Sequence, residues 1–126
     1  MVLIIGGAYQ GKLEFAKNEF NIPEKDVFSC ASEIDFIDFN KSIINRLDLF
    51  VLAMIKKQKD PVLYIKDNLQ QFNEKIIICD DISCGVVPIE YENRILREKV
   101  GHCLAIISKK SDRVVRLFCG IPMDLK

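Results

Sequence analysis

The start of the chain restricts its fold more than any other segment, because an apolar strand runs directly into a glycine turn. The run Val2–Ile5 is short and continuous, as in a strand that is covered on both faces. Gly6 and Gly7 end it, and after Lys12 apolar residues recur with the spacing of one helix face. These residues are Leu13, Ala16 and Phe20. A strand, a tight turn and a helix in this order are typical of α/β domains.

The rest of the chain predicts the same alternation. Its apolar runs indicate strands over residues 27–31, 36–39, 75–79 and 114–119, and helices over residues 40–57, 61–72 and 91–108. Asn40 is the expected N-cap of the helix over 40–57, and residues 83–88 are expected to form a loop. We therefore predict a single α/β domain, residues 1–126, with a mostly parallel sheet and helices on both of its faces.

Charge and cysteine content narrow the classes of function. Eighteen basic residues balance eighteen acidic ones, so the chain lacks the positive charge of a nucleic-acid-binding surface. No apolar stretch reaches the roughly 18 residues of a membrane span. The five cysteines form no C-x-x-C pair, which indicates buried free thiols in a reducing compartment. We expect a cytoplasmic protein without a zinc site.

The glycine turn carries the pattern G-x-x-x-x-G-K between Gly6 and Lys12. Such a turn points backbone N–H groups at one oxyanion, the following helix adds its positive dipole end, and the lysine neutralises terminal phosphates. Leu13 stands where the full motif has a Ser or Thr that binds Mg²⁺. A plain glycine turn with a surface lysine is the alternative. The expected nucleotide-binding residues are Gly6, Gly7, Ala8, Tyr9, Gln10, Gly11, Lys12 and Leu13.

Three carboxylates are candidates for the same site. Asp38 ends one predicted strand, and Asp80 and Asp81 follow another, so all three are expected at the carboxyl edge of the sheet, where ligands of parallel sheets bind. We predict that they hold Mg²⁺, with Lys12, Asp38 and Asp81 as the catalytic side chains. Ordinary helix capping or strand ends are the competing interpretation.

Arg94 and Arg97 share a helix face and are candidates for binding a phosphate or a carboxylate. A surface ladder of ion pairs with Glu90 and Glu98 explains them equally well. The single histidine, His102, lies on a largely apolar helix, where a packed or half-exposed side chain is a simpler interpretation than a catalytic one.

The C-terminal part of the chain resembles a known pattern. Its residues match the T-N-E-V-G-x-G-I/V-V-P…R…F-R-D…G…N…A-D-x-V…G-I/L-P tail of the CobU family, the adenosylcobinamide kinase/adenosylcobinamide-phosphate guanylyltransferases. The glycine turn is similar to the G-G-A-R-S-G-K-S loop of that family. Residues 27–32 are similar to its V-L-Y-I-A-T strand, and residues 36–39 to its L-L-E-C segment, with Asp38 in the acidic position. The matching tail residues are Cys79 to Pro88, Arg94, Arg97, Glu98, Gly101, Asp112, Val114 and Gly120 to Pro122.

The resemblance implies a RecA-like P-loop fold, a trimeric assembly and a role in cobalamin assembly or salvage. ATP or GTP, with Mg²⁺, is then the phosphoryl donor to the aminopropanol hydroxyl of adenosylcobinamide. The family carries its guanylyl-accepting histidine in a segment that is missing here between Ser32 and Phe36. We therefore expect the guanylyltransferase activity to be absent.

Three functional hypotheses follow. The first is a minimal CobU-like protein that binds a purine nucleotide and acts as a kinase. The second is a non-catalytic P-loop descendant that binds a nucleotide or a partner and has a regulatory role, which the loss of both the loop hydroxyl and the histidine segment favours. The third is a chain that only keeps the fold, as an interaction subunit with no ligand.

Overall fold

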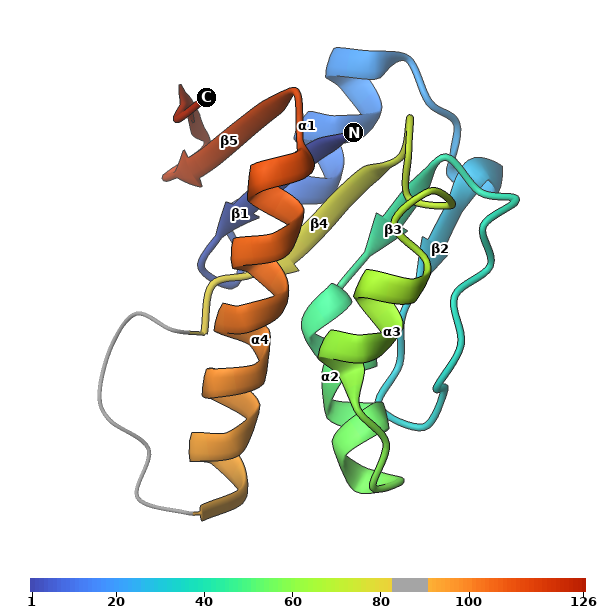
Figure 1. Ribbon diagram of the computed structural model, residues 1–126. Coiled ribbons are helices and arrows are strands. Elements are labelled where there is room, and N and C mark those ends of the chain that lie inside the picture. Colours follow the sequence, from blue (N-terminus) through green and yellow to red (C-terminus); the bar gives the residue numbers. More distant parts are fainter. Residues whose placement is uncertain (83–90) are drawn as a thin grey trace.

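A sheet of six strands forms the centre of the molecule (Figure 1). The computed structural model describes residues 1–82 and 91–126. The strand order is β2-β3-β4-β1-β5-β6, and all neighbours are parallel except β5 and β6. The predicted α/β fold with a mostly parallel sheet is therefore confirmed. The strands are β1 (Val2–Gly6), β2 (Val27–Ser29), β3 (Ile43–Asn45), β4 (Ile76–Asp80), β5 (Arg113–Phe118) and β6 (Ile121–Asp124).

Helices cover both faces of this sheet, as predicted. Figure 1 shows α1 behind the sheet, and α2, α3 and α4 together in front of it. A 3₁₀ turn, η1, precedes β2. The helical elements are α1 (Lys12–Phe20), η1 (Glu24–Asp26), α2 (Leu47–Lys56), α3 (Pro61–Asp67) and α4 (Tyr91–Lys110).

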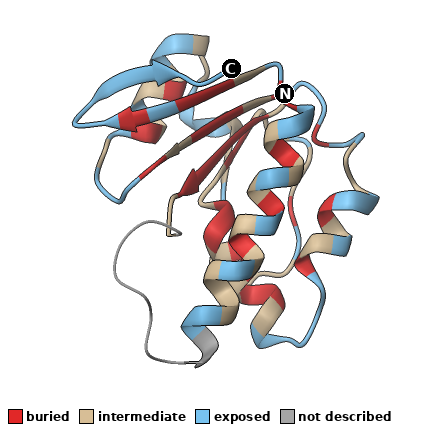
Figure 2. Ribbon diagram, turned by 60° about the vertical axis from the view of Figure 1, so that its left-hand side comes forward, coloured by how far each residue is buried: buried red, intermediate tan, exposed pale blue. Residues whose placement is uncertain are grey.

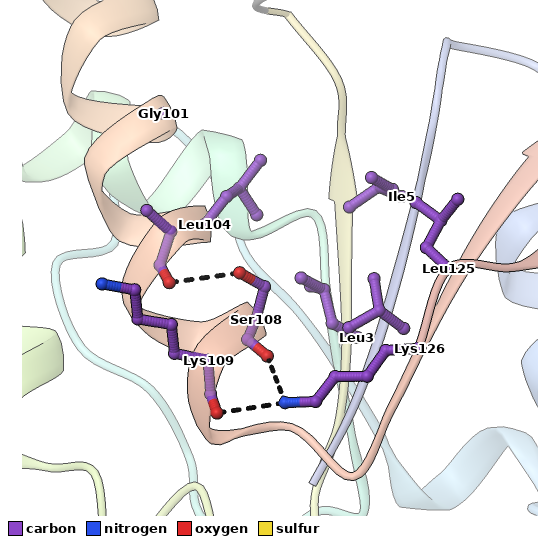
Figure 3. Close-up of a pocket in the computed structure, with 10 residues that line it drawn as sticks. Leu3, Ile5, Gly101, Leu104, Ser108, Lys109, Leu125 and Lys126 are labelled. Carbon is purple, nitrogen blue, oxygen red and sulfur yellow. Dashed lines mark hydrogen bonds between the residues drawn. The ribbon is translucent and has the colours of Figure 1, made fainter.

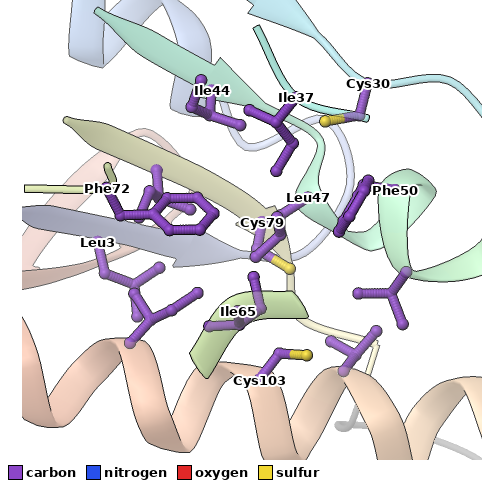
Figure 4. Packing of buried hydrophobic residues seen from close by; sticks show 14 of the residues in the cluster. Leu3, Cys30, Ile37, Ile44, Leu47, Phe50, Ile65, Phe72, Cys79 and Cys103 are labelled. Carbon is purple, nitrogen blue, oxygen red and sulfur yellow. The ribbon is translucent and has the colours of Figure 1, made fainter. Parts of the chain in front are cut away.

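Successive residues of the central strands point to opposite faces of the sheet and contribute to two separate apolar layers. Leu3 and Ile77 point to the larger layer, where they join Phe50 of α2, Ile65 of α3 and Cys103 of α4 (Figure 4). Every residue of β4 is buried, β1 and β5 are buried in part, and the helices carry stripes of buried residues (Figure 2). This pattern is that of strands covered on both faces. The smaller layer, under α1, includes Ile4, Ala16, Ile78, Val115 and Leu117.

The carboxyl end of β1 lies between two strands that hold it at close range. In the register of the sheet, Gly6 stands level with Asp80 of β4 and with Leu117 of β5. A Cβ atom on Gly6 would meet the carbonyl oxygen of Leu117 at 2.6 Å. Glycine is therefore required at this position by the approach of the neighbouring backbone.

The connections that leave β1 and β4 run in opposite directions. From β1 the chain passes through α1, on one face, to β2 at the edge of the sheet. From β4 it passes to α4, on the opposite face, and then to β5 on the other side of β1. A crevice opens at the carboxyl ends of such adjacent strands, and ligands of open α/β sheets bind there.

Two expectations for the middle of the chain are wrong. Residues 36–39 form no strand, and the helix expected from Asn40 begins only at Leu47. The intervening strand is Ile43–Asn45, whose Ile-Ile pair fits one face of a helix as well as it fits a strand, because short apolar runs do not distinguish the two. Arg46, with φ 59° and ψ 53°, separates this strand from α2.

The C-terminal hairpin was not predicted beyond its first strand. β6 is only four residues long, has no buried residue and contains Pro122, and a proline within a short run argues against a strand away from a sheet edge. Cys119 and Gly120 connect it to β5, with φ 51° and 75°. Two positive φ values in a two-residue connection match the twist of paired strands.

In the described part of the chain, no helix has the length and apolar character needed to cross a membrane.

Candidate phosphate-binding site

The glycine turn lies between β1 and α1, at the crevice described above. Tyr9 and Gly11 both adopt the left-handed conformation, with φ 62° and 78°. Gly11 is the N-cap of α1 and has no side chain with which to cap it. The N–H groups of the first helical turn therefore remain available to an acceptor outside the helix, and the dipole favours a negatively charged one.

Lys12 connects this turn to the sheet. Its side chain is only 6% exposed, and its Nζ donates to the carbonyl oxygen of Gly7 at 2.6 Å. The same Nζ lies 2.8 Å from Oδ1 of Asp80. An ammonium group that is buried needs such partners to offset its loss of water. The lysine of the motif is thus an integral part of the site, and the interpretation as a surface lysine is wrong.

A second ion pair continues the network across β4 to α2. Nη2 of Arg46 lies 3.0 Å from Oδ2 of Asp48 and 3.6 Å from Oδ2 of Asp80. Nε of Arg46 also donates to Oδ1 of Asp48 at 3.3 Å, which in turn accepts the backbone N–H of Asp80 at 3.2 Å. The hydrogen bond to Asp48 raises the pKa of the Arg46 guanidinium. Two cations and two carboxylates therefore alternate from α1 to α2.

The turn and this network border one hollow of about 350 Å³. Six of the eight predicted nucleotide-binding residues line it, while Gly6 and Gly7 precede it in the chain. Such a concave site with converging polar groups is typical of small-ligand binding. The lining residues are Ala8, Tyr9, Gln10, Gly11, Lys12, Leu13, Glu14, Asn45, Arg46 and Asp80.

The three predicted magnesium ligands do not come together. Asp38 is not at the end of a strand and lines a different hollow, beside Phe28 of β2. Asp81 directly follows β4, and its backbone N–H donates to the carbonyl oxygen of Gly6 at 2.8 Å. Among the described residues, no group of three or more His, Cys, Asp or Glu side chains is arranged to hold a metal ion.

The residues at the hollow also fit Mg²⁺ poorly. Both carboxylate oxygens of Asp80 lie against cations, Oδ1 against Lys12 and Oδ2 against Arg46. Leu13 presents an apolar side chain to the hollow and packs against the layer under α1. Magnesium requires several oxygen ligands in a fixed octahedron; Leu13 has none in its side chain, and Asp80 would have to share its oxygens with Lys12 and Arg46.

Sequence reasoning missed three residues that line the hollow: Glu14 of α1, Asn45 and Arg46. Asn45 and Arg46 reach the hollow because β3 ends at Asn45, next to β4. The Nδ2 of Asn45 donates to Oγ of Ser29 at 3.1 Å. The signal that would have found Asn45 and Arg46 was the correct third strand, since its carboxyl end reaches the same edge of the sheet as β1 and β4.

The remaining candidates lie elsewhere. Arg94 and His102 are exposed on α4, so the expectation of a packed or half-exposed His102 is wrong, and Arg97 is half-buried there. The loop expected over 83–88 falls outside the described residues, and so does Cys84. A larger hollow of about 560 Å³ lies beside α4 (Figure 3). Its lining is mostly apolar, and the Nζ of Lys126 at its rim donates to the carbonyl oxygens of Ser108 and Lys109.

The thiols for which the structure gives a position are free, and three of them are buried. Burial raises the pKa of Cys30 and of Cys103 to about 12, and it raises that of Cys79 well above its ordinary value. Cys119 is exposed at the hairpin turn, and its N–H donates to Oε1 of Gln10 in the glycine turn. The prediction of buried free thiols is confirmed for the first three.

Neither a scan against protein-family models nor a search of the curated proteins finds a match for the chain. The fold and the geometry of the site define its class: a mostly parallel α/β domain with a glycine turn and a buried, ion-paired lysine at the carboxyl edge of its sheet.

Proposed function

We propose that this chain binds a purine nucleotide, ATP or GTP, by its phosphates in the hollow between the glycine turn and Arg46. One observation carries the proposal. The lysine of a G-x-x-x-x-G-K turn is buried at the start of α1 and is fixed by Asp80 on the neighbouring strand, at the crevice where ligands of such sheets bind.

The resemblance noted in the sequence extends this proposal to a family and a reaction. The chain would be a shortened CobU-like protein with a RecA-like P-loop fold, acting in cobalamin assembly or salvage. In the kinase reaction, the hydroxyl oxygen of adenosylcobinamide attacks the γ-phosphorus, the bond to the leaving diphosphate breaks, and the hydroxyl proton is released. Such transfer depends mainly on positioning and on neutralisation of charge, which Lys12 would supply.

A non-catalytic role is the second candidate, and two contacts favour it. Leu13 offers no hydroxyl to a metal, and Asp80 already contacts Lys12 and Arg46. A protein of this kind would bind the nucleotide and transmit its presence to a partner without turnover.

The resemblance also makes a trimer part of the proposal. Exposed apolar side chains on the hairpin of β5 and β6 are available for contact between copies, namely Phe118, Ile121 and Met123. The strongly apolar α2 buries most of its apolar residues inside its own chain. Sedimentation equilibrium measures the assembly directly.

Calorimetric titration with GTP and with ATP, each with and without Mg²⁺, tests the binding proposal. Saturable binding of either nucleotide is expected, and no binding under any of these conditions would refute it. Transfer of ³²P from the γ-labelled nucleotide to adenosylcobinamide then separates the two roles. A labelled product supports the kinase, and binding without product supports the non-catalytic protein.

A further inference from the structure

We infer that Arg46 is a direct ligand of the phosphate chain and that, together with Lys12, it supplies the positive charge in this hollow without a divalent cation. The inference rests on the proposed function and deepens it. It assigns to the site a second cation that lies outside the G-x-x-x-x-G-K motif, and it specifies a metal-free polyphosphate as the ligand.

The guanidinium of Arg46 is placed for such a contact. Its side chain is 40% exposed and lines the hollow opposite the glycine turn. The bonds to Asp48 use Nε and Nη2, whereas a guanidinium carries five N–H donors. N–H groups therefore remain for a phosphate, which a guanidinium binds with short, charge-assisted hydrogen bonds.

The position of Arg46 is fixed rather than adaptable. Its backbone, between β3 and α2, adopts the left-handed conformation, which residues other than glycine rarely adopt. Asp48, only 7% exposed, holds the guanidinium through two hydrogen bonds. Unfavourable backbone conformations of this kind persist where surrounding structure imposes them, often at binding sites.

The charges around the hollow favour contact of the phosphates with Lys12 and Arg46 over contact with a bound metal ion. The carboxylates that border the hollow are Asp80 and Glu14. Asp80 contacts Lys12 and Arg46, and Glu14 pairs with Lys17 at 3.0 Å. With Leu13 in the hydroxyl position, a metal ion would have to compete with two fixed cations for its ligands. Lys12 and Arg46, each already paired with a carboxylate, would instead contact the phosphate oxygens through their remaining N–H groups.

The test is calorimetric titration of the whole chain with inorganic tripolyphosphate, in EDTA and in excess Mg²⁺. The wild type is expected to bind in EDTA at least as tightly as with Mg²⁺. Arg46→Gln should weaken binding by about tenfold, the effect of losing one charge-assisted hydrogen bond. The affinity of Arg46→Lys, which keeps the charge but loses the planar guanidinium, should lie between that of the wild type and that of Arg46→Gln.

The matched control is Arg113→Gln. Arg113 also pairs with an aspartate, Asp124, at 2.7 Å, but it lies at the opposite end of β5, level with Val2. Its substitution should leave the affinity within about twofold. If Arg46→Gln does not fold, the double variant Arg46→Gln/Asp48→Asn replaces the ion pair by two amides and removes the unpaired buried carboxylate.

The outcomes separate this inference from the proposed function. Equal binding by wild type and Arg46→Gln, or binding that appears only with Mg²⁺, would overturn the role of Arg46 and leave the phosphate site standing. If the wild type binds none of tripolyphosphate, GTP and ATP, with or without Mg²⁺, both the role of Arg46 and the proposed phosphate site are overturned.

Discussion

Lys12 at the start of α1 and Asp80 at the end of β4 form an ion pair of 2.8 Å, with both side chains largely buried. The pair joins the glycine turn to the centre of the sheet at the level of Gly6. It therefore has a structural effect as well as an effect on charge in the hollow, and the two can be measured separately.

Lys12→Met should lower both stability and phosphate affinity. The free energy of unfolding should fall by about 2 kcal/mol, because Asp80 keeps only the longer contact to Arg46 as an ionic partner in place of two. Nucleotide affinity should fall at least tenfold, by the loss of one charge at the phosphates. Urea unfolding and calorimetry measure the two effects. Arg113→Gln is again the control, since Arg113 lies at the opposite end of β5 and its pair with Asp124 is exposed, so the change should have little effect on either. An unchanged affinity in Lys12→Met would mean that the turn serves only the fold.

Leu13→Ser should create a dependence on Mg²⁺ that the wild type lacks. The hydroxyl would face the hollow at the position that binds the metal in the full motif. We expect Mg-nucleotide to bind about tenfold more tightly to the variant, with no gain in EDTA. Because Leu13 packs against the layer under α1, stability should fall by about 1 kcal/mol. Affinity that does not respond to Mg²⁺ would show that no metal is held at this position.

Two glycine substitutions should have opposite effects. Gly6→Ala places a Cβ atom 2.6 Å from the carbonyl oxygen of Leu117, which neither backbone can avoid, and should cost about 2 kcal/mol or more. Gly101→Ala lies inside α4, where no atom approaches within 4 Å, and should stabilise the protein by about 0.5–1 kcal/mol through its helix propensity. Thermal unfolding of both variants measures the difference, and a stable Gly6→Ala protein would contradict the described packing of β1 against β5.

The buried thiols should make the fold sensitive to alkali. Cys30 and Cys103 have pKa values of about 12 in the folded chain, whereas thiols in an unfolded chain ionise near 8.5. Their raised pKa values stabilise the fold fully below pH ~8.5, and this contribution is lost as the pH rises from there towards about 12. The urea midpoint should therefore be lower at pH 9.5 than at pH 7.5.

Reaction with a thiol reagent tests the same arrangement by another route. In a Cys84→Ser background, the exposed Cys119 should react rapidly at pH 8. The three buried thiols should react only when the protein unfolds. Rapid reaction of more than one thiol in the folded protein would contradict the packing shown in Figure 4.

The elements predicted best are those whose local pattern matches their burial. The run Ile76–Cys79 is apolar because β4 is covered on both faces, and α1 begins where Gly11 takes a positive φ. β3 was misread because two isoleucines do not distinguish a strand from a helix face. β6 was missed because Pro122 interrupts its short run, and proline is tolerated there because β6 lies at the edge of the sheet and pairs only with β5.

The sequence predicted the site only in part, because only some of its residues lie in segments with a clear local pattern. Lys12 and Asp80 were found because each has a local signal, a motif for one and a strand end for the other. Asp38 was assigned to the edge of the sheet through a strand that does not exist. Arg46 has no local signal, because it follows a strand that the sequence did not predict, and only the structure brings its guanidinium to Asp48 and Asp80.

We propose that the phosphates bind between the glycine turn and Arg46, and ¹⁵N NMR of the backbone amides can locate them residue by residue. On titration with GTP, the amide resonances of residues 7–13 and of Asn45 and Arg46 should shift together and saturate. The resonances of Leu104 and Ala105, beside the apolar hollow, should stay in place. If saturating GTP leaves the resonances of residues 7–13 unshifted, or shifts those of Leu104 and Ala105 instead, the phosphates do not bind at the glycine turn.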